Sequence, residues 1–399
     1  MEIRIIKPSE QIEYTAICNS VFFGSPRLDI REMRKKPDEH GKDDETIRLG
    51  YFSDTGKLLS ALSLIPYEMR LGDKTVKMGG IGAVVTRPDA RAGGFVRKLF
   101  DEAFQIMVRE GYVYSFLYPF SFDFYRKFGY ELCYARANAT IPMYTISGYH
   151  IPPAIEEFEP GGDTAPYEEI YRKFTADYSL SLVRSSETWR KRLKRDPYKN
   201  LEFTYLFRDE SGQPVSYILY GVESGDGGSN LDIDELCWVN PTGLQYAFGF
   251  IQRLGAEFSN VKWSNMPAGI VPHAMVADVF DVSLRHNGIG MGRLVDVAAS
   301  LATMPSPEGQ GQATIEVQDS YLPQNSGIYT ITWQNGQLSV AKTNTTPHIT
   351  TTVETLAQLV TGYLSLNEAA LKQDTTIVAN HKALAALFTK KNLYLKEYF

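Results

Sequence analysis

The stretch that decides the fold is VVTRPDARAGGFVRKLF, residues 84–100. Its first residues are β-branched and run into Arg87-Pro88, which predicts a strand that ends in a turn. Farther along, apolar side chains recur at helical spacing, at Val96, Leu99, Phe100, Ala103 and Met107. A junction of small residues and one arginine separates the two patterns, Arg91-Ala92-Gly93-Gly94. The sequence therefore predicts a strand, a loop with little side-chain bulk and an amphipathic helix.

This loop has the chemistry of an anion site. Small residues let the backbone come close to a ligand. The first N–H groups of a helix have no partner within it and carry partial positive charge, so they bind phosphate oxygens. Arg91 adds a cation that can bond in bidentate fashion. The segment from Arg91 to Arg97 is thus predicted to hold a pyrophosphate, and the alternative is a turn whose glycines serve packing alone.

Two familiar phosphate-binding motifs do not fit the loop. The Gly-Lys-Ser/Thr of a Walker loop is absent, and the second and third glycines of a dinucleotide fingerprint are not at the required offsets. Instead, the spacing Arg91-x-x-Gly94-x-Val96 resembles the Arg/Gln-x-x-Gly-x-Gly/Ala motif of the GNAT acetyltransferases, with Val96 in place of the final small residue. In that family the motif grips the pyrophosphate of coenzyme A.

The resemblance implies acetyl-CoA as the cofactor and names the residues that would bind it. The acyl-pantetheine arm would pair with the strand edge at Ala83, Val84 and Val85. The phosphates would lie on the loop and the first helical turn, formed by Arg91, Ala92, Gly93, Gly94, Phe95, Val96 and Arg97.

A second motif supplies a candidate acid. The segment FYRKFGYE, residues 124–131, resembles the aromatic-Tyr-x-x-Phe/Leu-Gly-Phe/Tyr signature that closes a GNAT core. Attack of an amine on a thioester expels a thiolate, and a phenol with a pKa of ~10 is a suitable proton donor to a thiol of ~8.5. Tyr125 is therefore the predicted general acid. A core tyrosine with its hydroxyl bonded to the backbone is the alternative.

The rest of the chain extends the resemblance. Residues 1–145 alternate between predicted strands and helices, a Pro- and Gly-rich linker covers 147–160, and a second mixed segment follows. We expect a strand over 130–141, a helix over 186–200 and a hairpin at Gln334-Asn335-Gly336. The glycine-rich 288–292 is interpreted as a loop that joins domains. The basic run 189–195 is interpreted as a solvated helix face.

As a whole, the chain resembles the enhanced intracellular survival (Eis) family of GNAT proteins. The resemblance implies a mixed α/β (α+β) fold with a GNAT domain at 1–147, a degenerate second GNAT domain without the Arg-x-x-Gly loop at 148–287, and a sterol-carrier-protein-like domain at 288–399. In that family the C-terminal carboxylate, often on a Phe, deprotonates the attacking amine, and the proteins form hexamers. The resemblance thus assigns the catalytic base to Phe399 and predicts a homo-oligomer.

A terminal carboxylate is a plausible base only in the right surroundings. Its ordinary pKa of ~3.5 is too low to deprotonate an ammonium of ~9–10. Burial raises that pKa, and positioning lets it accept the proton as the new bond forms. A frayed terminus is the alternative, but the strand-like LYLKEYF, residues 393–399, would then leave large apolar side chains in water. Glu68 is the other candidate base, although a solvated strand residue is its ordinary role.

Composition narrows the functional classes. The net charge of −6 offers no global basic field for nucleic acid. Neither the three separated cysteines nor the six histidines have metal-ligand spacing, so no metal is expected. The N-terminus does not resemble a signal peptide and no apolar run is long enough to span a membrane, so we expect a cytoplasmic protein without membrane association.

The sequence thus favours an acetyl-CoA-dependent N-acetyltransferase that transfers directly to a primary amine of a small cationic substrate, resembling an aminoglycoside, lysine or polyamine. Asp29, Asp123 and Glu397 are the candidate acidic linings, although Tyr398 places no acid at the penultimate position. Two alternatives stay open. One is a lipid or small apolar ligand carrier acting through the C-terminal domain, and the other is a tandem-GNAT aminoacyl transferase.

Overall fold

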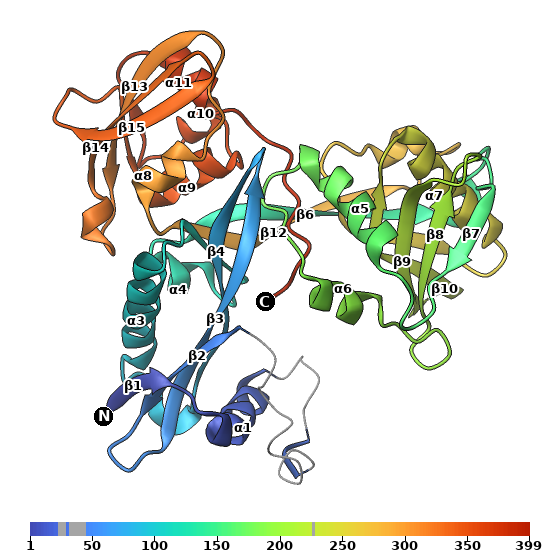
Figure 1. Ribbon diagram of the computed structural model, residues 1–399, viewed down its shortest axis with the longest axis horizontal. Helices are drawn as coiled ribbons and strands as arrows, with labels where there is room; N and C mark the ends of the chain where they lie inside the picture. Colours follow the sequence, from blue (N-terminus) through green and yellow to red (C-terminus); the bar gives the residue numbers. More distant parts are fainter. Residues whose placement is uncertain (23–28, 32–44, 226–227) are drawn as a thin grey trace.

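The computed structural model describes residues 1–22, 29–31, 45–225 and 228–399, which form two sheets with helices around them (Figure 1). The first sheet has twelve strands: β1 Glu2–Ile5, β2 Ile47–Phe52, β3 Leu58–Leu71, β4 Lys74–Thr86, β5 Tyr114–Leu117, β6 Glu131–Pro142, β7 Ala154–Glu157, β8 Glu202–Arg208, β9 Pro214–Gly225, β10 Gly228–Trp238, β11 Asn260–Met266 and β12 Ser283–Leu294. The second has five: β13 Gln310–Gln318, β14 Gly327–Gln334, β15 Gln337–Thr343, β16 Ile349–Thr352 and β17 Thr376–Ile377. The helices are α1 Gln11–Val21, α3 Phe95–Arg109, α4 Phe122–Arg126, α5 Ala165–Phe174, α6 Ser186–Leu193, α7 Pro241–Arg253, α8 Val297–Ala302, α9 Val353–Thr361, α10 Leu366–Ala369 and α11 His381–Leu387.

The large sheet contains the same unit twice. Its strand order is β1-β2-β3-β4-β5-β12-β6-β11-β10-β9-β8-β7. In the first half, β4 and β5 are parallel neighbours joined through α3, and in the second half β10 and β11 are parallel neighbours joined through α7. Each helix buries an apolar stripe on its sheet, as the 3.6-residue period of its sequence requires. The predicted tandem mixed α/β fold is thus present.

Strands β6 and β12 belong to both halves. The first part of β6 lies beside the part of β12 that pairs with β5, and the later part of β6 pairs with β11 (Figure 1). The prediction of a loop at 288–292 is therefore wrong, and the predicted boundary at 287/288 falls inside a strand. The glycines mark close packing: a Cβ on Gly292 would lie 2.8 Å from the Phe116 ring, and one on Gly290 would lie 3.0 Å from Tyr134.

The C-terminal domain has its own sheet, in the order β15-β14-β13-β16-β17. The predicted hairpin joins β14 to β15 through Asn335 and Gly336, both at positive φ (54° and 75°), as a two-residue turn between twisted strands requires. Helix α9 packs against β6 and β12 of the large sheet as well as β16 of its own. One apolar core therefore runs from the C-terminal domain into the first half of the large sheet.

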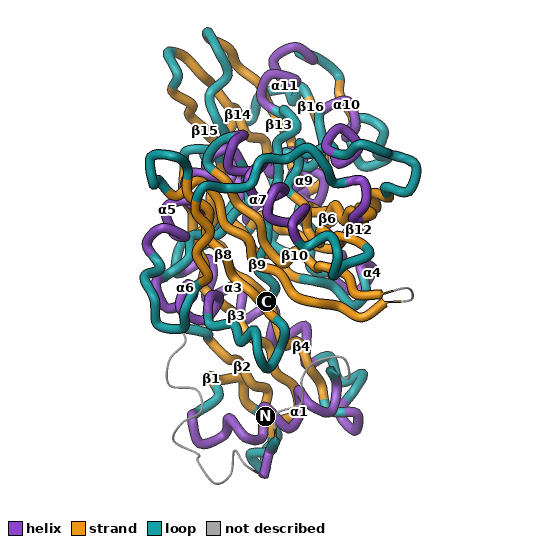
Figure 2. The backbone as a smooth tube through the Cα atoms, turned by 90° about the vertical axis from the view of Figure 1, so that its right-hand side faces the viewer, coloured by secondary structure: helices purple, strands orange, loops and turns teal. Residues whose placement is uncertain are grey.

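The chain returns to the middle of the molecule at its end. Figure 1 places the C-terminus between the two halves of the large sheet, and Figure 2 shows the N-terminus low in the molecule, beside β1 and β2 of the first half. Residues 396–399 have no regular secondary structure, so the expected terminal strand is absent. In the part of the chain described, no helix is long and apolar enough to cross a membrane.

Candidate functional site

The site begins where β4 and β5 separate. The two strands pair from Met78↔Tyr114 to Ile81↔Leu117, and within the described residues no strand pairs with the following part of β4 on that side. On its other side β4 carries a bulge, because its register with β3 shifts between Ala61↔Val85 and Ser63↔Gly82. Ala83, at the bulge, has φ 47°. A bulge re-aims the backbone, so Ala83 and Val84 present their main chain at the open edge.

The loop after β4 is open to solvent. Residues 91–94 are all exposed, and Ala92 and Gly94 adopt positive φ angles of 64° and 71°. Gly94 is the N-cap of α3 and has no side chain to bond the first-turn N–H groups. A Cβ on Gly94 would meet no atom within 4 Å. The first turn of α3 therefore offers backbone donors to an anion, with Arg91 exposed beside them.

The other residues predicted to bind the cofactor lie along the same unit. Val85 is buried, whereas Phe95 and Val96 are half-buried, and the Phe95 ring lies 4.5 Å from that of Tyr51. The Arg97 guanidinium lies 5.7 Å from the Phe128 ring and 5.6 Å from the Tyr321 ring. Its side chain thus lies toward the C-terminal domain, and its contribution to an anion site is the backbone N–H.

In the second half of the sheet, the N-terminus of the corresponding helix, α7, has no free backbone donors at Pro241 and Gly243. Helix α7 begins at Pro241, which has no N–H, and the Asn240 side chain accepts a hydrogen bond of 2.9 Å from the Gly243 N–H. The donors that α3 leaves open are thus blocked or used in α7. This local difference matches the expectation that the second domain is degenerate.

Tyr125 lies on α4, immediately after β5. Ser121 caps this helix at the Phe124 N–H (3.4 Å), and Gly129, at φ 78°, follows its end. The Tyr125 ring packs 5.4 Å from that of Phe120. Burial raises the pKa of Tyr125, so it stays protonated at neutral pH. None of the described residues forms a hydrogen bond with its hydroxyl.

Phe399 lies where β4 and β5 diverge. A Cβ on Gly82 would lie 3.1 Å from the terminal carboxyl carbon of Phe399, and one on Gly80 would lie 3.1 Å from the Phe399 ring. The ring also lies 5.4 Å from Tyr67 and 5.2 Å from Tyr118, the residue after β5. The terminus is therefore packed rather than frayed, and the bare β4 glycines make room for it.

The candidate acidic linings are not gathered around Phe399. The Glu397 carboxylate accepts a hydrogen bond from Arg184 Nε at 2.6 Å, Asp123 is an exposed partner of Arg126, and Asp29 is exposed. Glu68 is exposed too, as expected of a solvated strand residue. What surrounds the terminus is aromatic: Tyr398 stacks on Tyr118 at 4.5 Å. Glu397 was one of three candidate acidic linings, and the structure pairs its carboxylate with Arg184, in keeping with the doubt that Tyr398 at the penultimate position cast on a strongly anionic floor.

Sequence reasoning missed the ion pairs behind the terminus. The basic run 189–195, interpreted as a solvated face, ends α6 and directs Arg192 toward Glu235 (3.0 Å), while Arg195 pairs with Asp234. Both arginines are largely buried. A run of basic residues gives no signal of its distant acidic partners, which lie on β10 about forty positions along the chain.

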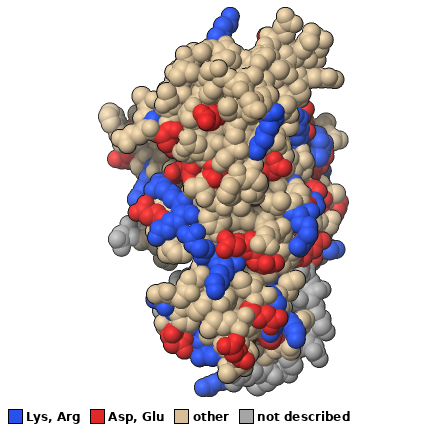
Figure 3. Space-filling model, turned by 90° about the vertical axis from the view of Figure 1, so that its left-hand side faces the viewer, with Lys and Arg blue, Asp and Glu red and all other residues tan. Residues whose placement is uncertain are grey.

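The cysteines and the possible metal ligands of the described residues can be assessed from their placement. No group of three or more His, Cys, Asp or Glu side chains there is placed to hold a metal ion. Burial raises the pKa of the Cys133 thiol to about 12 and that of Cys18 to about 11, so neither is a thiolate at neutral pH. Figure 3 shows groups of basic side chains with acidic side chains beside them on one face.

Comparison with known proteins agrees with this architecture. Residues 2–133 and residues 180–279 each match a model of a GNAT acetyltransferase domain, and residues 297–396 match a model of a sterol carrier protein domain. No curated protein gives a significant match to the sequence.

Solved structures share the fold along the whole chain. A GCN5-related N-acetyltransferase from Anabaena variabilis has a TM-score of 0.86 at 21% identity, with 100% of both chains covered. Eis1 from Mycobacterium abscessus has a TM-score of 0.81 at 18% identity, again with 100% of both chains covered. A GCN5-related N-acetyltransferase from Kribbella flavida has a TM-score of 0.79 at 19% identity, with 100% of this chain and 98% of the other covered. The chain therefore belongs to the GNAT acetyltransferases, as two such domains in tandem followed by a sterol carrier protein domain.

Proposed function

We propose that the protein is an acetyl-CoA-dependent N-acetyltransferase that transfers the acetyl group directly to a primary amine of a small cationic acceptor. The observation that carries this proposal is a single juxtaposition: an open helix N-terminus follows a strand whose free edge lies against the last residue of the chain. The helix N-terminus would bind the phosphates of the cofactor, and the free strand edge would pair with its thioester arm. The carboxylate of the last residue would accept the proton.

The residues fit coenzyme A. Backbone N–H groups at the start of α3 and the Arg91 guanidinium would hold the pyrophosphate, and the exposed loop leaves room for it. The main chain at Ala83 and Val84 would pair with the pantetheine arm, and a nearby N–H at Val85 would polarise the acyl carbonyl. Bound acetyl-CoA supplies the thioester that the amine attacks.

Two groups would then handle protons. The Phe399 carboxylate accepts one proton from the attacking amine, and the Tyr125 Oη–H donates a hydrogen bond to the sulfur as its negative charge develops. Burial raises the pKa of Tyr125, so complete proton transfer from its hydroxyl to a thiolate costs more free energy than it would for an ordinary phenol. The hydrogen bond to the developing thiolate therefore contributes more to catalysis than full proton transfer does.

The test is a thiol-release assay with acetyl-CoA and a panel of aminoglycosides, lysine derivatives and polyamines. We expect Tyr125→Phe to lower turnover by roughly 10²–10⁴-fold, the usual size of general acid–base catalysis. A chain that ends at Tyr398 should be similarly slow and should bind acetyl-CoA normally. Wild-type turnover in both variants would refute these roles, and absence of thiol release with every amine would refute the reaction.

The assembly and location of the protein are proposed from the resemblance and from the cysteines. We expect a hexamer, as in Eis proteins, which light scattering of the purified protein would reveal. We also expect a cytoplasmic protein, because its three cysteines form no disulfide.

A further inference from the structure

The segment that ends in Phe399 is fixed at successive residues by the second GNAT domain. The Tyr394 N–H bonds to the Ser179 carbonyl at 3.0 Å. The Leu395 carbonyl accepts a hydrogen bond of 3.1 Å from the Asn265 side chain. Lys396 Nζ lies 2.8 Å from an Asp234 carboxylate oxygen. These attachments leave the last residues of the tail little freedom before they reach the first domain.

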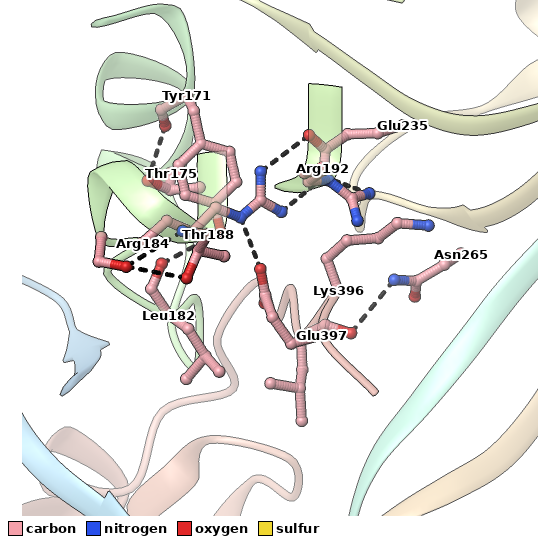
Figure 4. Close-up of polar contacts among 12 residues, drawn as sticks. Tyr171, Thr175, Leu182, Arg184, Thr188, Arg192, Glu235, Asn265, Lys396 and Glu397 are labelled. Atoms are coloured by element: carbon pink, nitrogen blue, oxygen red, sulfur yellow. Dashed lines mark hydrogen bonds and ion pairs between the residues drawn. The ribbon is translucent and has the colours of Figure 1, made fainter. Parts of the chain in front are cut away.

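Glu397 is held most firmly of all. Its side chain accepts a hydrogen bond of 2.6 Å from Arg184 Nε, while both terminal nitrogens of Arg184 bond to Glu235, at 2.9 and 2.6 Å (Figure 4). The side chains of Arg184 and Glu235 are 1% and 0% exposed. The Tyr118 hydroxyl, from the first domain, donates a 2.7 Å hydrogen bond to the Glu397 carbonyl. Glu397 thus ties the tail to both domains, two residues before the end of the chain.

These ion pairs call for an explanation other than stability. A buried ion pair contributes little net stability, because desolvation of both charges offsets their attraction. What it does provide is direction, since a guanidinium bonds two carboxylates only in a fixed geometry. The Arg184 guanidinium is further fixed 3.8 Å above the Tyr171 ring. The arrangement therefore sets where Glu397 lies more than it strengthens the fold.

The place of these contacts in the second domain is informative. Strands β10 and β11 pair only from Asn230↔Asn260 to Ile233↔Trp263. The next residues on β10 are Asp234 and Glu235, and Asn265 lies beyond the paired part of β11. The tail therefore lies where β10 and β11 separate. The equivalent place in the first half of the sheet, where β4 and β5 separate, is the proposed site of the thioester arm. The second domain has its helix terminus capped and its strand separation occupied by the protein's own C-terminal segment.

We propose that the second GNAT domain serves as a holder for the catalytic base of the first, with Arg184, Glu235 and Glu397 acting as positioning residues for the Phe399 carboxylate. The proposal rests on the proposed role of Phe399. A misplacement of about 1 Å in a reacting group can cost on the order of 10²-fold in rate. Loss of the Glu397 attachment should therefore slow the chemical step while leaving the distant pyrophosphate site intact.

The decisive variant is Glu397→Ala, which removes the side-chain attachment of the tail to Arg184 and keeps the Arg184–Glu235 pair. We expect kcat to fall by about 10- to 100-fold with an unchanged KM for acetyl-CoA. Glu397→Gln, which retains an acceptor for Arg184 Nε, should recover most of the loss. Glu156→Ala, which breaks the exposed pair with Arg208 in the same domain, is the matched control and should have wild-type kinetics.

A second comparison separates positioning from any other effect. In a chain that ends at Tyr398 the base is already lost, so adding Glu397→Ala should cause no further decrease in kcat. Two results would overturn the positioning proposal while the role of Phe399 stands, provided that the shortened chain is slow. The first is a wild-type kcat for Glu397→Ala in the full-length chain. The second is that Glu397→Ala lowers kcat by the same factor in the shortened chain as in the full-length chain. If the shortened chain has wild-type turnover, the base assignment itself fails, and the positioning proposal fails with it.

Discussion

The ion pair between Arg293 and Asp319 joins the first GNAT domain to the C-terminal domain, and its removal should be costly. Arg293 lies on β12 and both side chains are 0% exposed. One terminal nitrogen of Arg293 lies 3.0 and 2.8 Å from the two Asp319 oxygens, and the other donates to the Phe128 carbonyl at 2.6 Å. Phe128 belongs to the motif that contains Tyr125, so the pair also supports the segment that carries the candidate acid.

The size of the effect follows from complete burial. Asp319 accepts hydrogen bonds from the Leu322 N–H at 2.9 Å and the Asn325 amide at 3.0 Å as well as from Arg293. Asp319→Asn would leave the arginine charge without its counter-ion, and breaking a buried pair from one side costs about 3–5 kcal/mol. With about 2–4 °C of Tm per kcal/mol in domains of this size, we expect a fall on the order of 10 °C.

Thermal unfolding followed by circular dichroism, together with urea denaturation, measures this directly. The double variant Arg293→Met/Asp319→Leu should be more stable than Asp319→Asn, because no unpaired charge is then buried. Glu169→Gln, which removes an exposed pair with Arg172, is the control and should change stability by less than about 1 kcal/mol. If Asp319→Asn is as stable as the control, or if the double variant is the least stable of the set, the reasoning is refuted.

Two further predictions concern pH and the loop. Although desolvation raises the pKa of Glu235, the nearby charges of Arg184 and Arg192 outweigh it and hold that pKa well below its usual range. The stability that ionised Glu235 contributes is therefore fully present above the unfolded-state pKa of about 4.3 and is lost as pH falls further. The free energy of unfolding, measured by urea denaturation between pH 3 and 7, should therefore decrease at the acid end, and it should decrease less in Glu235→Gln. Gly94→Val should raise the KM for acetyl-CoA at least roughly tenfold, because a β-branched residue strains φ 71° and covers the helix donors; an unchanged KM would remove the loop from the cofactor site.

Local sequence patterns predicted the parts of this fold that depend on neighbours in the chain. The strand, loop and helix of residues 84–100 follow from β-branched residues, glycines and helical spacing, and the structure contains them in that order. The hairpin at Asn335 and Gly336 likewise follows from the ability of those residues to adopt positive φ. In each case the interaction that decides the structure lies within a few residues.

Contacts between distant segments were beyond that reasoning. Strand β12 inserts between β5 and β6 although more than a hundred residues separate it from them in the chain. Its glycines resemble those of a loop in sequence, and only the facing Phe116 and Tyr134 rings explain them. The bulge at Ala83 had no signal either, since alanine rarely adopts positive φ.

The same non-local geometry bears on the proposed catalytic base, the Phe399 carboxylate. A terminal carboxylate needs no side chain to carry it, so it can fit against the bare glycines of β4 where a bulkier residue would clash. It has no helix or strand of its own, however, and an unheld terminus frays. Precise placement must therefore come from residues nearby in space, and the ion pairs of the second domain lie two residues upstream. On this proposal, a GNAT domain without an Arg-x-x-Gly loop serves catalysis in its neighbour by holding the tail in place.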